Sequence, residues 1–77
     1  MELRQLRYFV AIVEEGGFSR AAERLHVSQP PLSTQIRNLE SEIGVQHLER
    51  NDRSVVLTTA GSVFYEEVLA VLARLEH

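Results

Sequence analysis

Short polar side chains between residues 28 and 41 offer hydrogen-bonding chemistry on one face of a predicted helix. At 100° per residue, the polar positions of this segment fall opposite its apolar positions. Glutamine can bond twice to adenine, serine, threonine or proline carbons can contact a thymine methyl group, and arginine can reach guanine or a phosphate. We therefore expect this face to contact DNA through Ser28, Gln29, Pro30, Pro31, Ser33, Thr34 and Arg37. Whether Thr34 or Arg37 reaches a base is left open.

The histidines and serines form no catalytic or metal-binding pattern. His26 lies in a predicted tight turn, and His47 is separated from Glu49 by one residue, with no third ligand at a spacing typical of zinc sites. Ser28 and Ser33 have no histidine–carboxylate pair at an informative spacing, and a serine nucleophile needs an adjacent base. The chain has no cysteine, which excludes disulfides and thiolate metal sites. We expect no enzyme activity, no metal and no cofactor.

Three helices must position the polar face. Apolar residues at helical spacing predict a first helix over residues 3–15, which Gly16 ends, because glycine tolerates the left-handed conformation of a helix C-terminus. Ser19 is expected to cap a short second helix over 20–25. Ser28 is expected to cap the third helix, 28–43, whose first turn holds two prolines. Two helices joined by a short turn are typical of a helix-turn-helix, with 28–43 as the recognition helix in a major groove.

A hairpin and a fourth helix follow. Residues 47–50 and 54–57 flank a turn-prone segment, so we expect a hairpin over about 47–57. This hairpin would project Arg50 and Arg53 toward phosphates or into the narrower minor groove. Thr58 or Thr59 is expected to cap the last helix, which runs to the end of the chain without a stop signal. That pattern suggests a larger protein cut short.

The last predicted helix carries a wide apolar stripe. A domain of 77 residues buries only about 60% of the surface of its unfolded chain and usually needs further reinforcement. Disulfides are excluded, so association with a second copy is the remaining source of burial. We expect a two-fold homodimer through Phe64, Val68, Val71, Leu72 and Leu75.

The distribution of charge matters more than its sum. The net charge of −3 is unfavourable for a protein that binds phosphates. Residues 19–37, however, carry a net charge of +2, whereas residues from 58 onward carry −2. The acidic groups are therefore concentrated away from the predicted DNA-binding face. Whether Arg20 and Arg24 contact phosphate or are solvated helix charges is left open.

Together these elements predict a mainly α fold. We divide it into a winged helix-turn-helix, residues 1–57, with three helices and a β-hairpin wing, and a long linker and dimerisation helix, residues 58–77. No apolar run approaches the roughly 20 residues that a bilayer span requires. The N-terminal segment 1–7 carries both charge signs and is not a signal peptide. We expect a cytoplasmic protein.

The segment Phe18–Ser33, FSRAAERLHVSQPPLS, resembles the signature of LysR-type transcriptional regulators. Leu6–Phe9, Leu48–Arg50 and Leu57–Gly61 fit the same family in the same order, so the resemblance covers nearly the whole chain. The segments Met1–Arg4 and Gln29–Ser33 are most similar to regulators of aromatic-compound degradation.

The resemblance implies an N-terminal DNA-binding domain, joined by a linker helix to an effector-binding domain that this chain lacks. Such proteins bind interrupted palindromes in double-stranded DNA as dimers or tetramers. By position, Gln29, Pro30, Pro31 and Ser33 would meet the major groove, and Arg53 would lie in the wing.

Two positions depart from the family pattern. Many relatives have arginine where this chain has Thr34, so Arg37 is a possible replacement for a base or phosphate contact. Relatives often have Leu-Phe where this chain has His47-Leu48, and a polar ring there is expected to loosen packing beneath the wing.

Two other functions compete with sequence-specific DNA binding. The acidic balance and the apolar last helix also suit a protein-interaction module that dimerises without DNA affinity. A small metal-dependent enzyme is the third alternative, which a metal assay on purified protein would exclude.

Overall fold

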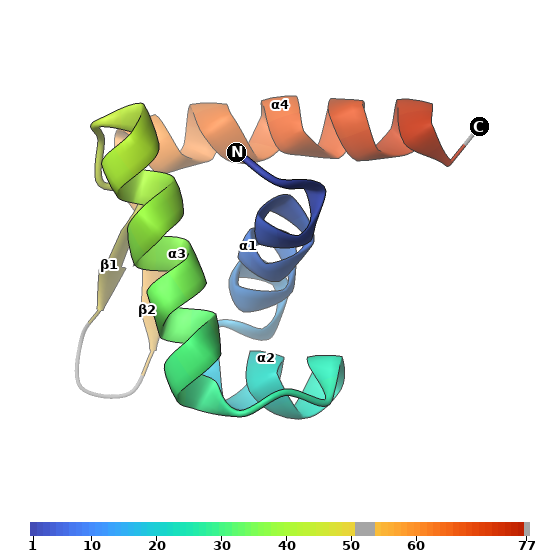
Figure 1. Cartoon of the computed structure of the whole chain (residues 1–77). Coiled ribbons are helices and arrows are strands. Elements are labelled where there is room, and N and C mark those ends of the chain that lie inside the picture. The colour runs from blue at the N-terminus through green and yellow to red at the C-terminus, as the bar shows by residue number, and fades with distance from the viewer. Residues whose placement is uncertain (51–53, 77) are drawn as a thin grey trace.

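Four helices and a two-stranded hairpin make up the computed structural model, which describes residues 1–50 and 54–76 (Figure 1). The predicted order of elements is confirmed. In chain order the elements are α1 (Leu3–Glu15), α2 (Phe18–Leu25), α3 (Gln29–Ile43), β1 (Leu48–Arg50), β2 (Val55–Leu57) and α4 (Thr59–Leu75).

The cap predicted for the second helix is wrong. Gly17 is the N-cap of α2, and no side chain caps the helix. The helix starts earlier because Phe18 is buried in the core, whereas Ser19 is exposed. Ser28 does occupy the N-cap of α3, but its side chain accepts no hydrogen bond there. An N-cap oxygen bonds the N–H of the second or third helical residue, and here both are prolines, which have no N–H.

The helices pack around one apolar core. Its largest fully buried side chains come from α1 and α3: Phe9, Ile12, Leu32 and Leu39. The small residues Ala21 and Ala22 of α2 are also buried, which suits a close approach of α2 to its neighbours. A partly buried hydrogen bond of 3.1 Å joins Gln5 Nε2 to Gln35 Oε1 and links α1 to α3.

The hairpin is tied to the helices at its open end. β1 and β2 pair antiparallel, with Leu48 opposite Leu57. The Glu40 carboxylate of α3 accepts hydrogen bonds from the backbone N–H groups of His47, at 2.7 Å, and Leu48, at 3.1 Å. The N–H of Thr58 donates to the carbonyl of His47 at 2.9 Å. Because α3 and the start of α4 both hold this strand, the hairpin has a defined position beside α3.

Thr58, rather than Thr59, caps the last helix. Its Oγ1 accepts a hydrogen bond from the N–H of Gly61 at 2.9 Å and donates to the carbonyl of Gln46 at 2.8 Å. One side chain thus caps α4 and links it to the segment before β1. Among the described helices, none has the length and apolarity needed to cross a membrane.

His47 lies in the core beneath the hairpin. Its ring stacks on Phe64, with centroids 4.4 Å apart, and meets Phe9 edge-on at 6.0 Å. The ring is 2% exposed, and its Nδ1 has no hydrogen-bond partner among the described residues. Burial lowers the pKa of His47, and the negative charge of Glu40 opposes this effect in part.

We expect His47 to make the stability of the chain depend on pH. Because the folded pKa lies below the unfolded value of about 6.5, the unfolded chain takes up a proton first as the pH falls. The contribution of neutral His47 to the stability of the fold is therefore fully present above about pH 6.5. It is lost as the pH falls through the lower folded pKa. The free energy of unfolding, measured with urea, should fall less between pH 7.5 and pH 5 for His47→Leu than for the wild type.

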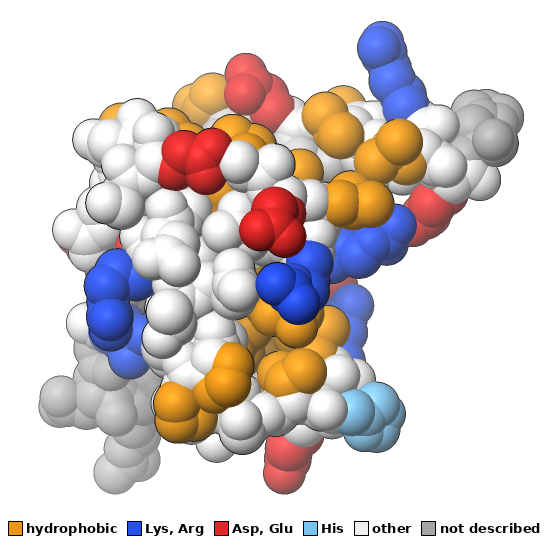
Figure 2. All heavy atoms as spheres, in the orientation of Figure 1, with side chains coloured by type: hydrophobic (Ala, Val, Ile, Leu, Met, Phe, Trp, Pro, Cys, Tyr) orange, Lys and Arg blue, Asp and Glu red, His pale blue; other side chains and the backbone are white. Residues whose placement is uncertain are grey.

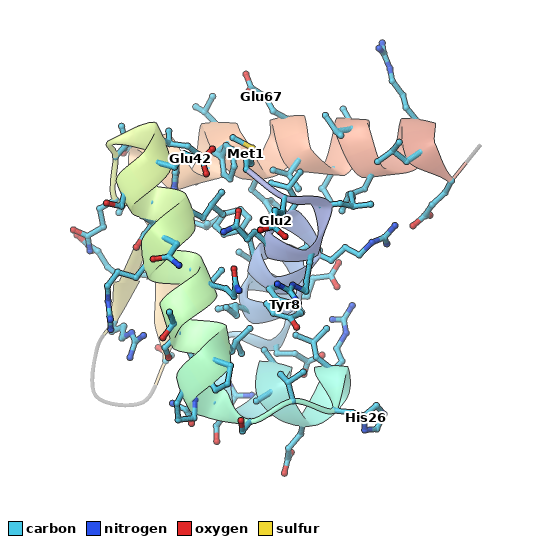
Figure 3. All side chains as sticks on the ribbon, viewed as in Figure 1. Met1, Glu2, Tyr8, His26, Glu42 and Glu67 are labelled. Carbon is cyan, nitrogen blue, oxygen red and sulfur yellow. The ribbon has the colours of Figure 1, made fainter. Side chains whose placement is uncertain are left out.

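At pH 7.5 the free energy of unfolding of His47→Leu should lie within about 1 kcal/mol of the wild-type value. The change removes a ring stack, but it also removes a buried nitrogen that has no partner among the described residues. His26→Asn is the matched control, since His26 is exposed at the turn between α2 and α3 (Figure 3). Equal pH slopes for His47→Leu and the wild type would contradict the prediction.

Candidate nucleic-acid interface

One face of α3 is open to solvent along its length. In Figure 1 α3 lies at the front of the molecule, and no other element crosses in front of it. The predicted contact residues on this face are exposed, apart from Ser33, which is half-buried. The opposite face buries Leu32, Ile36 and Leu39, as the sequence pattern predicts. The structure thus places the predicted contact residues of α3 together on one accessible surface.

The turn before α3 sets the direction of this surface. His26 ends α2 in the left-handed conformation, with φ of 58°, and the N–H of Val27 donates to the carbonyl of Ala22 at 3.0 Å. The chain therefore reverses within three residues and starts α3 at Gln29. A short helix, a tight turn and a second helix with an exposed polar face form the helix-turn-helix arrangement.

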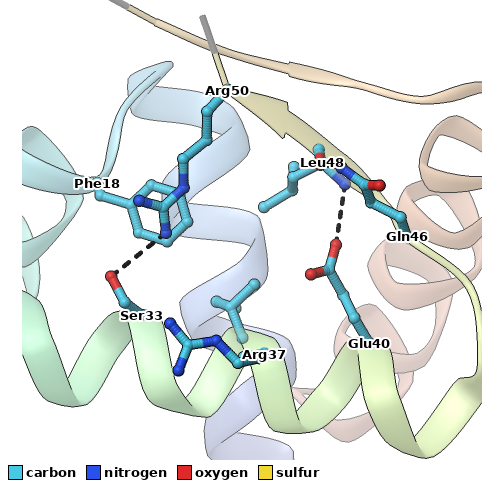
Figure 4. A pocket seen from close by; sticks show the side chains of 8 residues that line it. Phe18, Ser33, Arg37, Glu40, Gln46, Leu48 and Arg50 are labelled. Carbon is cyan, nitrogen blue, oxygen red and sulfur yellow. Dashed lines mark hydrogen bonds between the residues drawn. The ribbon is translucent and has the colours of Figure 1, made fainter.

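The hairpin places Arg50 beside α3, whereas Arg53, the other predicted wing contact, lies outside the described residues. The guanidinium carbon of Arg50 lies 3.9 Å from the centre of the Phe18 ring. Its Nη2 donates to Ser33 Oγ across 3.4 Å (Figure 4). The three residues line a cleft between α3, β1 and the start of α2.

Sequence reasoning did not find this contact. Phe18 reads simply as a core residue, and Arg50 follows Ser33 by 17 positions. The three side chains come from three different elements, so no spacing within a short stretch of sequence predicts that they meet.

The arginines near α3 have no acidic partners within the described part of the chain. Elsewhere, Arg24 pairs with Glu14 at 2.8 Å and with Glu15 at 3.3 Å. The hydrogen bond that Arg24 donates to Glu14 is the main cause of the raised pKa of Arg24. Weaker exposed pairs join Arg4 to Glu2 and Arg7 to Glu76.

Arg37 and Arg50, by contrast, have no ion pair to a described residue, and the nearby Glu40 accepts two backbone hydrogen bonds. Two arginines without an ion pair to a described residue therefore lie at α3 and the hairpin. Despite the net charge of −3, this face suits a polyanion. Arg20 and Arg24 have partners within their own chain. Arg20 Nε donates to the carbonyl of Glu15 at 2.9 Å, and Arg24 pairs with acidic side chains. We therefore assign neither of them to a phosphate contact.

The apolar stripe of α4 is divided between two faces. Val68 is 2% exposed and Leu72 9%, because both pack into the core of their own chain. Phe64 is half-buried, with its ring centre 5.2 Å from that of Phe9. Val71 and Leu75 are exposed. Val68 and Leu72 belong to the core, so Val71 and Leu75 are the accessible part of the predicted dimer contact, which stays a prediction.

Val63, which sequence reasoning did not assign to the dimer contact, is 60% exposed on α4. Its spacing of eight residues from Val71 is the signal that could have found it. Figure 2 shows hydrophobic side chains at the surface along α4, and Figure 3 shows Glu67 pointing outward from the same helix. An exposed apolar surface with one central carboxylate therefore follows the outer side of α4. Within residues 1–50 and 54–76, no three potential metal ligands cluster together.

An exposed polar recognition helix, a preceding helix joined by a tight turn and a flanking hairpin define a winged helix-turn-helix domain of the kind that binds DNA. The model of the bacterial regulatory helix-turn-helix proteins of the lysR family matches residues 3–62, and the chain belongs to this family.

The chain is 55% identical over 76 residues to a probable cat1 operon transcriptional activator of Acinetobacter lwoffii, covering 99% of this chain and 25% of that protein. It is 54% identical over 77 residues to the Hca operon transcriptional activator HcaR of Escherichia coli, covering 100% of this chain and 26% of HcaR. The chain thus spans about a quarter of the length of these relatives.

Solved structures of protein–DNA complexes are also similar to the chain. The DNA-binding domain of BenM, a regulator from Acinetobacter baylyi, in complex with catB site 1 DNA matches with a TM-score of 0.95 and 53% identity, over 99% of this chain and 85% of that one. The CbnR DNA-binding domain in complex with DNA matches with a TM-score of 0.95 and 47% identity, over 99% of this chain and 87% of that one. The mainly α winged helix-turn-helix fold is therefore confirmed.

Proposed function

We propose that this chain is the DNA-binding part of a bacterial transcriptional regulator that reads an interrupted palindrome in double-stranded DNA. The observation that carries this proposal is the open polar face of α3, flanked by arginines without acidic partners among the described residues. The complexes of the BenM and CbnR DNA-binding domains with DNA support it, because their chains match nearly all of this one.

Each predicted contact residue of α3 has a role in this proposal. Gln29, Ser33 and Thr34 face base edges in the major groove, and the ring carbons of the two prolines contact thymine methyl groups. The N-terminus of α3 at Ser28 presents the positive end of the helix dipole to a phosphate. Arg37 binds a phosphate or guanine. Arg53 belongs to the proposed wing contact, together with Arg50.

The full-length protein would act in the cytoplasm as a regulator and not as an enzyme. Residues 58–77 would form the linker to an effector domain that binds a small molecule, as the family resemblance implies. The division between this linker and residues 1–57 stays a prediction, since α4 also contributes Val68 and Leu72 to the core. The resemblance to regulators of aromatic-compound degradation guides the choice of target genes to test.

Dimerisation through α4 would bring two recognition helices to one side of the DNA. The contact that we propose uses the exposed side chains Val63, Val71 and Leu75. Two identical apolar surfaces related by a two-fold axis would cover each other, and binding of one half-site would raise the effective concentration at the second. Full-length chains could extend this contact to tetramers.

We expect Val71→Asp to weaken the dimer strongly, because it places a carboxylate in the centre of the proposed apolar contact. The Val71 side chain is 46% exposed in the single chain, so the fold should tolerate the change. Sedimentation velocity over a range of concentrations measures the effect. Ser62→Asp, another exposed position on α4, is the control. An unchanged dimer in Val71→Asp would place the interface elsewhere.

The test of DNA binding uses two steps. The wild-type chain first selects duplexes from a randomised library, with catB site 1 DNA as a reference probe. Fluorescence anisotropy then compares the selected duplex with a shuffled one at low and near-physiological salt. We expect recovery of an interrupted palindrome and preferential binding that survives the higher salt.

Equal binding to both duplexes that collapses with salt would mean electrostatic attraction alone. Dimerisation with no binding to either duplex would favour the protein-interaction module and overturn the proposal.

A further inference from the structure

The Arg50 side chain joins three parts of the interface that are far apart in sequence. It starts on β1, its guanidinium covers the ring of Phe18 at the start of α2, and it reaches Ser33 on α3 (Figure 4). Phe18 is 6% exposed, so the stacking surface itself is held in the core. The guanidinium therefore has a defined place between the hairpin and the recognition helix.

The hydrogen bond from Arg50 occupies one of the two acceptor lone pairs of the Ser33 hydroxyl. A guanidinium is a donor only, so Ser33 Oγ must be the acceptor in this contact. The hydroxyl proton is then free to point elsewhere. Ser33 is half-buried and lies among the predicted contact residues of α3, so we expect this proton to point toward a bound groove.

We propose that Arg50 is a positioning residue, which stacks on Phe18 and orients the Ser33 hydroxyl as a hydrogen-bond donor toward bases in the major groove. This inference rests on the proposed function. The chemistry of the groove then sets a preference. Guanine, adenine and thymine each present an acceptor there, whereas cytosine presents only its amino donor. With its proton oriented toward the groove, Ser33 is therefore expected to favour a base that presents an acceptor over cytosine.

Lysine cannot replace arginine in this role. An ammonium keeps the charge but has no planar surface to stack on Phe18 while it donates to Ser33. Arg50→Lys thus separates positioning from simple attraction to phosphate. A phosphate contact would largely survive the change, whereas the orientation of Ser33 would not.

The experiment compares the wild type with Arg50→Lys, Ser33→Ala and the double variant. Each binds duplexes that differ from the library-selected site at one half-site position at a time, and anisotropy is measured at several salt concentrations. Arg74→Lys is the matched control, since Arg74 is an exposed arginine of α4, far along the chain from the interface. Circular dichroism confirms that each variant folds.

We expect Arg50→Lys and Ser33→Ala to reduce discrimination against cytosine at the same position by about fivefold, the lower end for a specific base contact. The double variant should lose no more discrimination against cytosine than either single variant. The salt dependence of DNA binding should be the same for Arg50→Lys as for the wild type. In the free chain, the Arg50 side-chain protons should show an upfield ring-current shift from Phe18, which Arg50→Lys removes.

Base preferences of Arg50→Lys equal to those of the wild type would overturn the inference and would leave Arg50 as a phosphate contact, which lysine largely retains. Changes at two different positions in the single variants would overturn the orientation of Ser33 by Arg50. A wild-type chain that selects no motif would instead contradict the proposed function, and this inference with it.

Discussion

Replacing Gly61 with alanine is expected to destabilise the chain by about 3 kcal/mol, the upper part of the usual range for overpacking. A Cβ atom at this position would lie 2.0 Å from the carbonyl oxygen of His47 and 2.8 Å from its carbonyl carbon. Both atoms belong to backbone, which is held by Glu40 and Thr58 and cannot move aside cheaply. Helix propensity alone predicts the opposite sign, since alanine favours a helix by about 1 kcal/mol over glycine.

Urea unfolding followed by circular dichroism measures this effect. Gly44→Ala is the matched control: Gly44 has φ of +82°, but a Cβ there meets nothing within 4 Å. That change should lower the free energy of unfolding by only about 1 kcal/mol, because a residue with a Cβ atom is less stable than glycine in the left-handed conformation. A Gly61→Ala variant as stable as the wild type would show that the hairpin and α4 do not approach so closely.

Gln29→Ala is expected to weaken binding to the selected palindrome by about 5- to 150-fold, which corresponds to the 1–3 kcal/mol of a bidentate base contact. Gln29 is the first residue of α3 and its side chain is exposed, so its loss should not affect folding. Binding to the shuffled duplex should hardly change, because phosphate contacts carry no sequence information. Anisotropy titration of both duplexes gives the two affinities.

Asn38→Ala provides the control for Gln29, since Asn38 is an exposed amide toward the other end of α3. We expect little loss of specific binding from this change. If Gln29→Ala weakened binding to both duplexes equally, the side chain would contribute general affinity and not base recognition.

The acidic net charge does not conflict with these expectations, because local pairing decides the field at the interface. Arg24 is paired with both glutamates at the end of α1, so its charge is not available at α3. Arg37 and Arg50 keep their charge for a partner. The salt dependence of binding should therefore report the few arginines at α3 and the hairpin, and not the total charge of the chain.

Several features of the interface could be predicted because they depend on local periodicity. Apolar positions three and four apart identify the buried side of α3, and the remaining positions must then face outward. The left-handed residues Gly16 and Gly44 mark helix ends for an equally local reason. The caps at Ser19 and Ser28 were less predictable, because a buried phenylalanine and two prolines override the usual preference.

Dividing the α4 stripe required the tertiary structure. Phe64, Val68 and Val71 look equivalent in the sequence, yet Val68 is buried and Val71 is exposed. The angle at which α4 crosses α1 decides which of them a neighbour covers, and helical spacing contains no information about that angle.

The sequence by itself determined the order of elements, the family and the polar face of α3, since each follows from neighbouring residues or a contiguous motif. The tertiary structure alone decided three things: the contact of Arg50 with Phe18 and Ser33, the close approach of Gly61 to His47, and the surface of α4 left for a partner. These depend on how separate elements pack together. Packing is set by the shape and volume of the whole core, which no short stretch of the chain specifies.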